Sequence, residues 1–182
     1  MKEKIRLLSI IMAILLSGPV LTSCHTSKKS SGGDRSHVSA DFDKGRKNRH
    51  KKIEATRWGR QIIDEAYTWL GTPYAYSRAD KGVATDCSGM VLKVYEKIAG
   101  IKLPRNSAKQ AEFCKSIKQK DVKMGDLVFF ATGKSEDKIS HVGIMLDDRN
   151  FIHASASKGV VISDVTQPYY VRTFRGYGRV EE

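Results

Sequence analysis

Residues 85–100, TDCSGMVLKVYEKIAG, decide how this chain folds. Five apolar side chains after Cys87 recur at the spacing of one helical face: Met90, Val91, Val94, Tyr95 and Ile98. Gly100 follows the last of them, and glycine is the usual residue just beyond a helix. The stretch therefore predicts an amphipathic helix over 87–99 that begins at a cysteine and packs one face against a core.

Two further helices are predicted, one on each side of this one. Residues 58–70 carry an apolar stripe that ends at Gly71. On the other side, Asn106 or Ser107 opens a helix in which Ser107 and Gln110 have the capping-box spacing. All three predicted helices precede residue 123.

Beyond Lys123 the pattern changes to short strands. Five segments have strand-like composition: 126–132, 141–146, 150–155, 160–164 and 174–180. The links between them are rich in glycine, serine and aspartate, as turns and loops are. Consecutive strands with short links pair antiparallel, so the predicted fold class is α+β, with helices packed on an antiparallel sheet.

Cys87 stands in a small, polar setting, between Asp86 and Ser88. At a helix start, unpaired backbone N–H groups and the helix dipole stabilise a thiolate, so we expect the pKa of Cys87 to lie below that of a free thiol. The same N–H groups can hold an oxyanion. A nucleophilic cysteine is the first interpretation, and a structural thiol or a disulfide are the alternatives.

Two histidines fall on consecutive predicted strands. Alternation places His141 and Gly143 on one face of their strand, and His153 and Phe151 on one face of the next. A short antiparallel link would bring the imidazoles side by side, one as the base for Cys87 and the other orienting it, with Gly143 leaving room for substrate. Two unrelated surface histidines are the alternative. A metal site has little support, since the chain lacks HExxH and CxxC motifs.

The first 56 residues have the composition of an export signal and a tether. Residues 1–23 combine a basic start with a short apolar run broken at Gly18-Pro19, as in secretory signals. The stretch ending at Cys24 resembles a bacterial lipoprotein signal, which predicts lipidation of Cys24 and a membrane anchor. An ordinary signal peptide or an uncleaved anchor are the alternatives. Residues 24–56 are then a flexible basic tether, and 57–182 the folded domain.

The formal charge of +12 on this 182-residue chain suggests an anionic partner. Residues 25–57 hold ten lysines or arginines against four acidic residues. A nucleic-acid reader would carry its basic patch on the folded domain, so we expect no nucleic-acid partner. Attraction to anionic lipid or cell-wall polymer is favoured, with simple solvation as the alternative. The protein is expected to be extracytoplasmic. His25, where inner-membrane lipoproteins have aspartate, favours the outer membrane of a diderm host.

Six motifs, in this order, resemble those of the NlpC/p60 family of cell-wall cysteine peptidases. They are GTPY at 71–74, DCSG at 86–89, LPR at 103–105, GDLVFF at 125–130, HVGI at 141–144 and FIHAS at 151–155. The resemblance implies a compact papain-like fold with Cys87 as nucleophile, His141 as base and His153 as the residue that orients the base. It also implies that Tyr74 lies near the oxyanion.

The resemblance extends to the surroundings of the cysteine, with one departure. Asp86 and Ser88 match positions that bind the substrate's amino end in some family members. Members often have Tyr-x-x-Gly-Gly where this chain has Tyr74 followed by Ala-Tyr-Ser-Arg, so the loop and its substrate contacts are expected to differ. Cys114 matches no motif; we predict that it lies on the helix after Ser107 as a packing residue and forms no disulfide with Cys87.

The function implied by the resemblance is hydrolysis of peptide stems or cross-links of bacterial peptidoglycan, in wall remodelling or turnover. The bond would be γ-D-glutamyl–diamino acid or D-alanyl–diamino acid. No cofactor or metal is expected, and the protein is expected to be a monomer. A catalytically inactive wall-binding or scaffold lipoprotein and an amidase or acyltransferase on the same fold are the alternatives.

Overall fold

The computed structural model describes residues 53–181. The predicted signal segment 1–23, the predicted lipidation site Cys24 and the predicted tether up to residue 52 lie outside the described residues. Within 53–181, no helix is both long enough and apolar enough to cross a membrane.

The last four residues of the predicted tether, 53–56, are bonded to the domain. Ala55 forms a parallel bridge with Met124. The N–H of Thr56 donates to the Met124 carbonyl at 3.0 Å, and the N–H of Met124 donates to the Glu54 carbonyl at 2.7 Å. Among the described residues, contacts of the domain with the segment before it extend back to Ile53, four residues before the predicted boundary.

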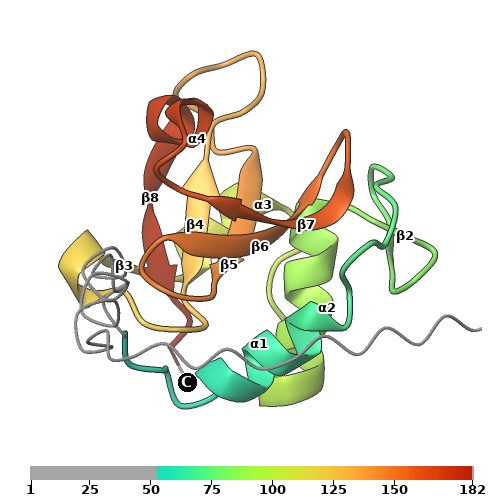
Figure 1. The fold of residues 1–182 in the computed structure, drawn as a ribbon, viewed down its shortest axis with the longest axis horizontal. Coiled ribbons are helices and arrows are strands. Elements are labelled where there is room, and N and C mark those ends of the chain that lie inside the picture. The colour runs from blue at the N-terminus through green and yellow to red at the C-terminus, as the bar shows by residue number, and fades with distance from the viewer. Residues whose placement is uncertain (1–52, 182) are drawn as a thin grey trace, which may run out of the picture. The chain divides into compact units, whose positions relative to one another are not determined.

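The described residues form four α-helices, three of them in predicted segments (Figure 1). They are α1 (Gly59–Tyr67), α2 (Cys87–Ala99), α3 (Ser107–Phe113) and α4 (Pro168–Thr173). The bounds of α2 are the predicted ones, because the Asp86 carboxylate accepts the N–H of Gly89 at 2.7 Å and Gly100 takes a φ of 70° just beyond the last turn.

The other two predicted helices differ in detail. Beyond Tyr67 the chain continues with i→i−3 hydrogen bonds, which end α1 early and leave Leu70 44% exposed. In α3 the cap is Asn106, whose side chain accepts the N–H of Lys109. The predicted capping box is therefore wrong, because the Gln110 amide donates instead to two carbonyls outside the helix.

The strands form two antiparallel sheets. The larger sheet has the order β3-β8-β4-β5-β6-β7, with strands β3 (Lys115–Ile117), β4 (Leu127–Phe130), β5 (His141–Met145), β6 (Asn150–Ser155), β7 (Gly159–Asp164) and β8 (Phe174–Arg179). The smaller sheet pairs β1 (Ala79–Asp80) with β2 (Ala84–Thr85). A 3₁₀ turn, Gln119–Asp121, follows β3. The five predicted strands are confirmed; β1, β2, β3 and α4 were not predicted.

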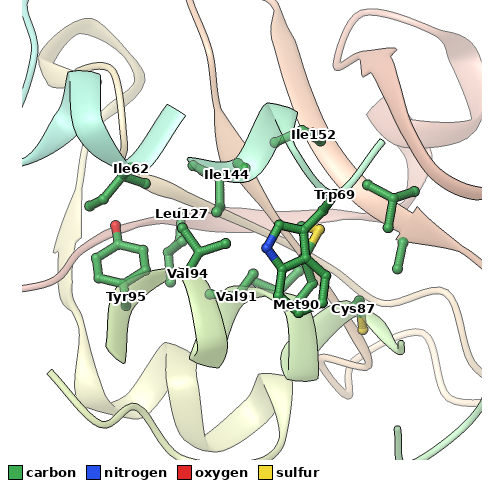
Figure 2. Packing of buried hydrophobic residues seen from close by; sticks show 14 of the residues in the cluster. Ile62, Trp69, Cys87, Met90, Val91, Val94, Tyr95, Leu127, Ile144 and Ile152 are labelled. Atoms are coloured by element: carbon green, nitrogen blue, oxygen red, sulfur yellow. The ribbon is translucent and has the colours of Figure 1, made fainter. Parts of the chain in front are cut away.

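The main core lies between the helices and one face of the larger sheet. Helix α2 packs on β5 and β6, with α1 beside it (Figure 1). Figure 2 shows Ile62 of α1 and Val94 of α2 close to Leu127 of β4, and all three side chains are buried. A second cluster covers the other face of the sheet and includes Phe130, Met145 and Phe151. The site described next lies where α2 and β5 both begin.

Candidate active site

Cys87 is the first residue of α2, and it is 7% exposed. The backbone N–H groups of Val142, Ser88 and Cys87 itself lie near its sulfur and act to lower the pKa of the thiol. Val142 follows His141 on β5. The start of α2 therefore meets the start of β5, which brings Cys87 to the strand end that carries His141.

The two histidines form a hydrogen-bonded pair. Nε2 of His141 lies 2.8 Å from Nδ1 of His153, and the rings meet edge to face at 88° with centroids 4.9 Å apart. The predicted pairing of the imidazoles is confirmed, and it follows from the antiparallel register in which Ile144 faces Ile152. His153 is 2% exposed, whereas His141 is half-buried. Nδ1 of His141 is the nitrogen left for a partner on the other side.

Burial determines the protonation states of these three side chains. It raises the pKa of Cys87 to about 11, although the three N–H groups act to lower it. It lowers the pKa of His141 to about 4 and, together with the charge of His141, lowers that of His153 to about 3. The free site therefore holds a neutral thiol and neutral imidazoles. The low thiol pKa expected from the helix start is not found, because desolvation of the sulfur outweighs the N–H groups.

A cleft of about 530 Å³ opens in front of Cys87. It is lined by Tyr74, Tyr76, Asp86, Cys87, Ser88, Asn106, Ser107, Ala108, Lys109, Glu112, Lys138, Ile139 and Ser140. Burial raises the pKa of Tyr74, and the negative charge of Asp86 raises it further. The structure thus brings Tyr74, Asp86 and Ser88, the other three predicted site residues, to the same cleft as Cys87.

The Asp86 carboxylate is occupied by donors of this chain. Arg105 binds both oxygens, at 2.9 and 2.8 Å. One oxygen also accepts the N–H of Gly89 and lies 3.1 Å from the Ser88 hydroxyl oxygen, and the other accepts the N–H of Ser77 at 2.8 Å. Burial acts to raise the pKa of Asp86, but these donors outweigh it and hold the pKa below its usual value. These four N–H donors fill the acceptor sites of the carboxylate, so a substrate amine at Asp86 would have to share it with Arg105.

Ser88 is part of the same network. Its hydroxyl donates to the Arg105 carbonyl at 2.7 Å and accepts from the Arg105 guanidinium at 3.0 Å. Arg105 also donates to the Arg78 carbonyl at 3.0 Å. A Cβ on Gly89 would lie 2.3 Å from that carbonyl oxygen, which explains glycine at this position of α2. Arg105 thus joins the loop after Tyr74 to the start of α2.

The loop after Tyr74 contains the departure from the family pattern. Ser77 occupies the first of the two positions where members often have glycine. Its φ is 63°, and among residues 53–181 it is the one non-glycine residue with a positive φ. That conformation aims its N–H at Asp86. The loop therefore keeps a conformation that suits glycine, at the cost of strain in a serine.

Gly143 has a different role from the one expected. A Cβ at this position would lie 2.5 Å from Cδ2 of the Phe151 ring. The ring stacks on His153 at 28°, with centroids 4.7 Å apart. The missing side chain thus leaves room for Phe151 rather than for substrate, because Phe151 projects across the strand pair toward Gly143.

Three residues at the site were not singled out from the sequence. Arg105 binds Asp86 from a loop 19 positions away, and Ser163 and Tyr170 contact His153 from β7 and α4. The LPR motif was the one available signal for Arg105. Within 53–181 no group of three or more histidine, cysteine or acidic side chains is placed to hold a metal ion.

Cys114 lies outside this site. It follows α3 in extended backbone rather than lying within the helix as predicted, and it packs against the main core. Cys87 and Cys114 are both free thiols. Burial and the charge of Asp126 raise the pKa of Cys114 to about 12.

Comparison with curated proteins finds relatives over most of the chain. A "Probable endopeptidase" of Haemophilus influenzae is 36% identical over 62% of this chain and 69% of its own length. The "Murein DD-endopeptidase MepS/Murein LD-carboxypeptidase" of Escherichia coli is 30% identical over 94% of this chain and 89% of its own length.

Solved structures share the fold. An NlpC/P60 protein from Bacillus cereus superposes with a TM-score of 0.62 at 29% identity, covering 70% of this chain. One described as similar to lipoprotein, NLP/P60 family, from Staphylococcus aureus gives 0.63 at 32% identity, covering 72%. This chain spans 41% and 44% of those two proteins, respectively. The expected papain-like α+β fold is confirmed.

This chain also matches the sequence model of one protein family. The sequence model of the NlpC/P60 family matches residues 66–179. That range holds Cys87, both histidines and the Asp86–Arg105 pair, and it includes every strand of the larger sheet. The chain belongs to the NlpC/P60 family.

Proposed function

We propose that this protein is a cysteine peptidase that hydrolyses peptide bonds in bacterial peptidoglycan. The observation that carries the proposal is the His141–His153 pair, hydrogen-bonded at 2.8 Å, at the strand end that meets Cys87. Family membership supports it, as do relatives named murein DD-endopeptidase, in Escherichia coli, and DL-endopeptidase, in Bacillus subtilis.

The proposed reaction begins with a neutral thiol. As Sγ of Cys87 attacks the substrate carbonyl, its proton passes to Nδ1 of His141, and the carbonyl oxygen becomes an oxyanion beside the first N–H groups of α2 and Tyr74. The C–N bond then breaks, and His141 gives its proton to the leaving amine. Water, deprotonated by His141, hydrolyses the thioester and releases the thiol. His153 keeps the His141 ring oriented through Nε2.

The D-alanyl–diamino acid cross-link is the preferred bond in this proposal. The relative named DD-endopeptidase aligns over 94% of this chain, whereas the one named DL-endopeptidase aligns over 66%. The saturated Asp86 carboxylate also disfavours a substrate whose free amino end would need it. Asp86 and Ser88 would then contact substrate as part of the Arg105 network rather than as a free anionic site.

Digestion of purified peptidoglycan tests the function and the bond together. The full chain, Cys87→Ala and Cys114→Ala are incubated with cross-linked muropeptides, and the products are identified by mass spectrometry. We expect monomers from the wild type and Cys114→Ala, and none from Cys87→Ala. Equal products from wild type and Cys87→Ala, or none from any protein, would reject the peptidase and favour a wall-binding role. Cleavage within stems would reassign the bond.

We further propose lipidation at Cys24 and an extracytoplasmic location. The support is the sequence of residues 1–24, together with the cell-wall substrates in the names of the relatives. Metabolic labelling with an alkyne fatty acid should mark the wild type and not Cys24→Ala. On cell fractionation, the wild type alone should be found in the membrane fraction. Equal labelling of both proteins would reject the anchor.

A further inference from the structure

Behind His153, on the side away from His141, lie two hydroxyl groups. Nε2 of His153 is 3.0 Å from Oγ of Ser163 on β7 and 3.1 Å from the hydroxyl of Tyr170 on α4. The Tyr170 hydroxyl donates to Oγ of Ser163 at 3.2 Å, so the three polar atoms form a closed triangle. His153 is 2% exposed, and both of its ring nitrogens therefore have partners within the protein.

The hydrogen on the His153 ring can be assigned from these partners. His141 can accept a proton at Nδ1 only if that nitrogen is bare, and a neutral imidazole then carries its hydrogen on Nε2. Nε2 of His141 must donate to Nδ1 of His153, which places the His153 hydrogen on Nε2, facing the two hydroxyl oxygens. Hydroxyl groups can accept such a hydrogen, whereas a buried Nε2–H without an acceptor would be costly.

We propose that Ser163 and Tyr170 are positioning residues that hold His153 in the Nε2–H tautomer and thereby keep Nδ1 of His141 available as the base. This inference rests on the proposed function for its catalytic consequence. The tautomer of His153 is a property of the fold and can be measured without substrate.

The packing around His153 prevents other arrangements of the ring. Phe151 stacks on one side, and the Tyr170 ring meets both Phe151 and His153 edge to face, at 89° and 82°. Gly143 leaves the space that the Phe151 ring needs. A flipped His153 ring would exchange its nitrogens for carbons, which would leave His141 and the hydroxyl groups without a partner. The aromatic rings set the plane of His153, and the hydroxyl groups set its hydrogen.

Both hydroxyl groups can also satisfy their own hydrogens. Tyr170 donates to Ser163. Ser163 and Tyr170 line a surface cavity of about 510 Å³ on this side of the sheet, so the Ser163 hydroxyl can donate to solvent there. The donated hydrogens thus all point away from Cys87 and toward the cavity, from His141 to His153, then to the hydroxyl groups and to solvent, and each hydroxyl donates once.

The test combines the spectroscopic assignment with kinetics. Imidazole ¹⁵N spectra of the full chain should show His141 and His153 as Nε2–H tautomers. Ser163→Ala and Tyr170→Phe each leave one acceptor, and each should lower kcat a few-fold; the double variant should lower kcat by about 10–100-fold with little change in KM. Ser163→Thr keeps a hydroxyl and should keep activity. Ser157→Ala and Tyr169→Phe, exposed neighbours of the same types, should match the wild type.

The outcomes separate the two proposals. An Nδ1–H tautomer of His153 in the wild type would overturn the inference whatever the activity, as would a folded double variant with unchanged kcat. If the double variant does not fold, the single variants and Ser163→Thr provide the test. Ser163→Ala and Tyr170→Phe should each lower kcat with little change in KM, and Ser163→Thr should keep the wild-type activity. A wild type that shows both Nε2–H tautomers but cleaves no peptidoglycan would reject the proposed function and leave the tautomer assignment supported.

Discussion

The regions around Cys87 and Cys114 contain the same residue types, except that one of them also has a pair of histidines. At the cleft, the Asp86 carboxylate is bound through two N–H groups of Arg105, beside Cys87. At the start of β4, the Asp126 carboxylate is bound by Arg179 at 2.8 and 2.7 Å, and burial and the charge of Asp126 raise the pKa of Cys114 to about 12. Each region thus has a buried aspartate, a paired arginine and a thiol whose pKa burial raises.

The histidine pair is what the second region lacks. Within residues 53–181 the histidines are His141 and His153, and His141 pairs across from Phe130, at the other end of β4 from Asp126. Asp126 and Phe130 are four residues apart along this extended segment, which separates them by about 13 Å at about 3.3 Å per residue. The thiol of Cys114, beside an ion pair, packs against the main core, whereas Cys87 lies at the strand end that carries the histidine pair. Under the proposed function, that pair supplies the base for Cys87.

The largest expected effect comes from removing that base. His141→Ala should lower kcat by about 10²–10⁴-fold or more, because proton transfer to and from the reacting groups is lost. His153→Asn keeps an acceptor for the His141 N–H and should retain measurable activity, with His153→Ala between the two. Steady-state kinetics on cross-linked muropeptides, with thermal unfolding to confirm folding, measures this order. If His153→Asn is as inactive as His141→Ala while folded, the roles assigned to the two histidines are wrong.

The two arginines should separate activity from stability. Arg105→Gln should lower kcat/KM by roughly 10–100-fold, because the start of α2 and the loop after Tyr74 lose their link. Arg179→Gln leaves a fully buried Asp126 carboxylate with the N–H of Lys123 and should cost ~3–5 kcal/mol of stability, with kcat/KM per folded molecule unchanged. Denaturant unfolding and kinetics of the matched pair measure both. A loss of activity in folded Arg179→Gln would contradict the division.

The histidine pair should also make folding stability depend on pH. Burial lowers the pKa values of His141 and His153 to about 4 and about 3 in the folded protein, whereas both lie near 6.5 in the unfolded chain. Between pH 6.5 and these lowered values, the unfolded chain therefore binds more protons than the folded protein does. The contribution of the two histidines to stability is therefore fully present above pH 6.5 and is lost as the pH drops toward 4, by up to about 1.4 kcal/mol per pKa unit. His153→Asn should flatten this slope. A wild-type unfolding temperature that is constant from pH 6.5 to 4.5 would show that burial does not lower these pKa values.

The smallest expected effect concerns backbone strain near each aspartate. Gly125 precedes Asp126 with a φ of 91°, whereas Ser77, which donates to Asp86, has a φ of 63°. Ser77→Gly should relieve strain and raise stability by no more than about 1 kcal/mol. Ser157→Gly, at an exposed position without a positive φ, is the matched control and should be neutral or slightly destabilising. A lower unfolding temperature for Ser77→Gly would mean that the serine side chain contributes more than the strain costs.

The sequence predicted the elements that have a clear period and missed those that depend on distant partners. Helix α2 and strands β4 to β8 follow from apolar spacing, and the histidine pair follows from alternation on two linked strands. Strands β1, β2 and β3, of two or three residues, are too short to show a period. Helix α4, PYYVRT, is rich in aromatic and β-branched residues that favour strands, and its helical start rests on Pro168.

At the site, Cys87 at the start of α2 and the two histidines on β5 and β6 were predictable, whereas Arg105, Ser163 and Tyr170 were not, because each is placed there by contact with a residue distant in the sequence. Arg105 reaches Asp86 across two loops, and no local pattern encodes that contact. The pKa of Cys87 could not be judged from its helix position either, because the helix supplies N–H groups while the tertiary structure determines how far the sulfur is removed from water.

The order of strands in the larger sheet has a consequence for synthesis of the protein. Strand β8 lies between β3 and β4, although it follows every other strand along the chain. A ribosome releases β4 to β7 first, and these can pair as they emerge, but β4 keeps one open edge until residues 174–179 arrive. A prematurely terminated chain presents that edge, which favours aggregation or degradation. The sheet therefore closes, and joins Arg179 to Asp126, only in a chain synthesised through residue 179.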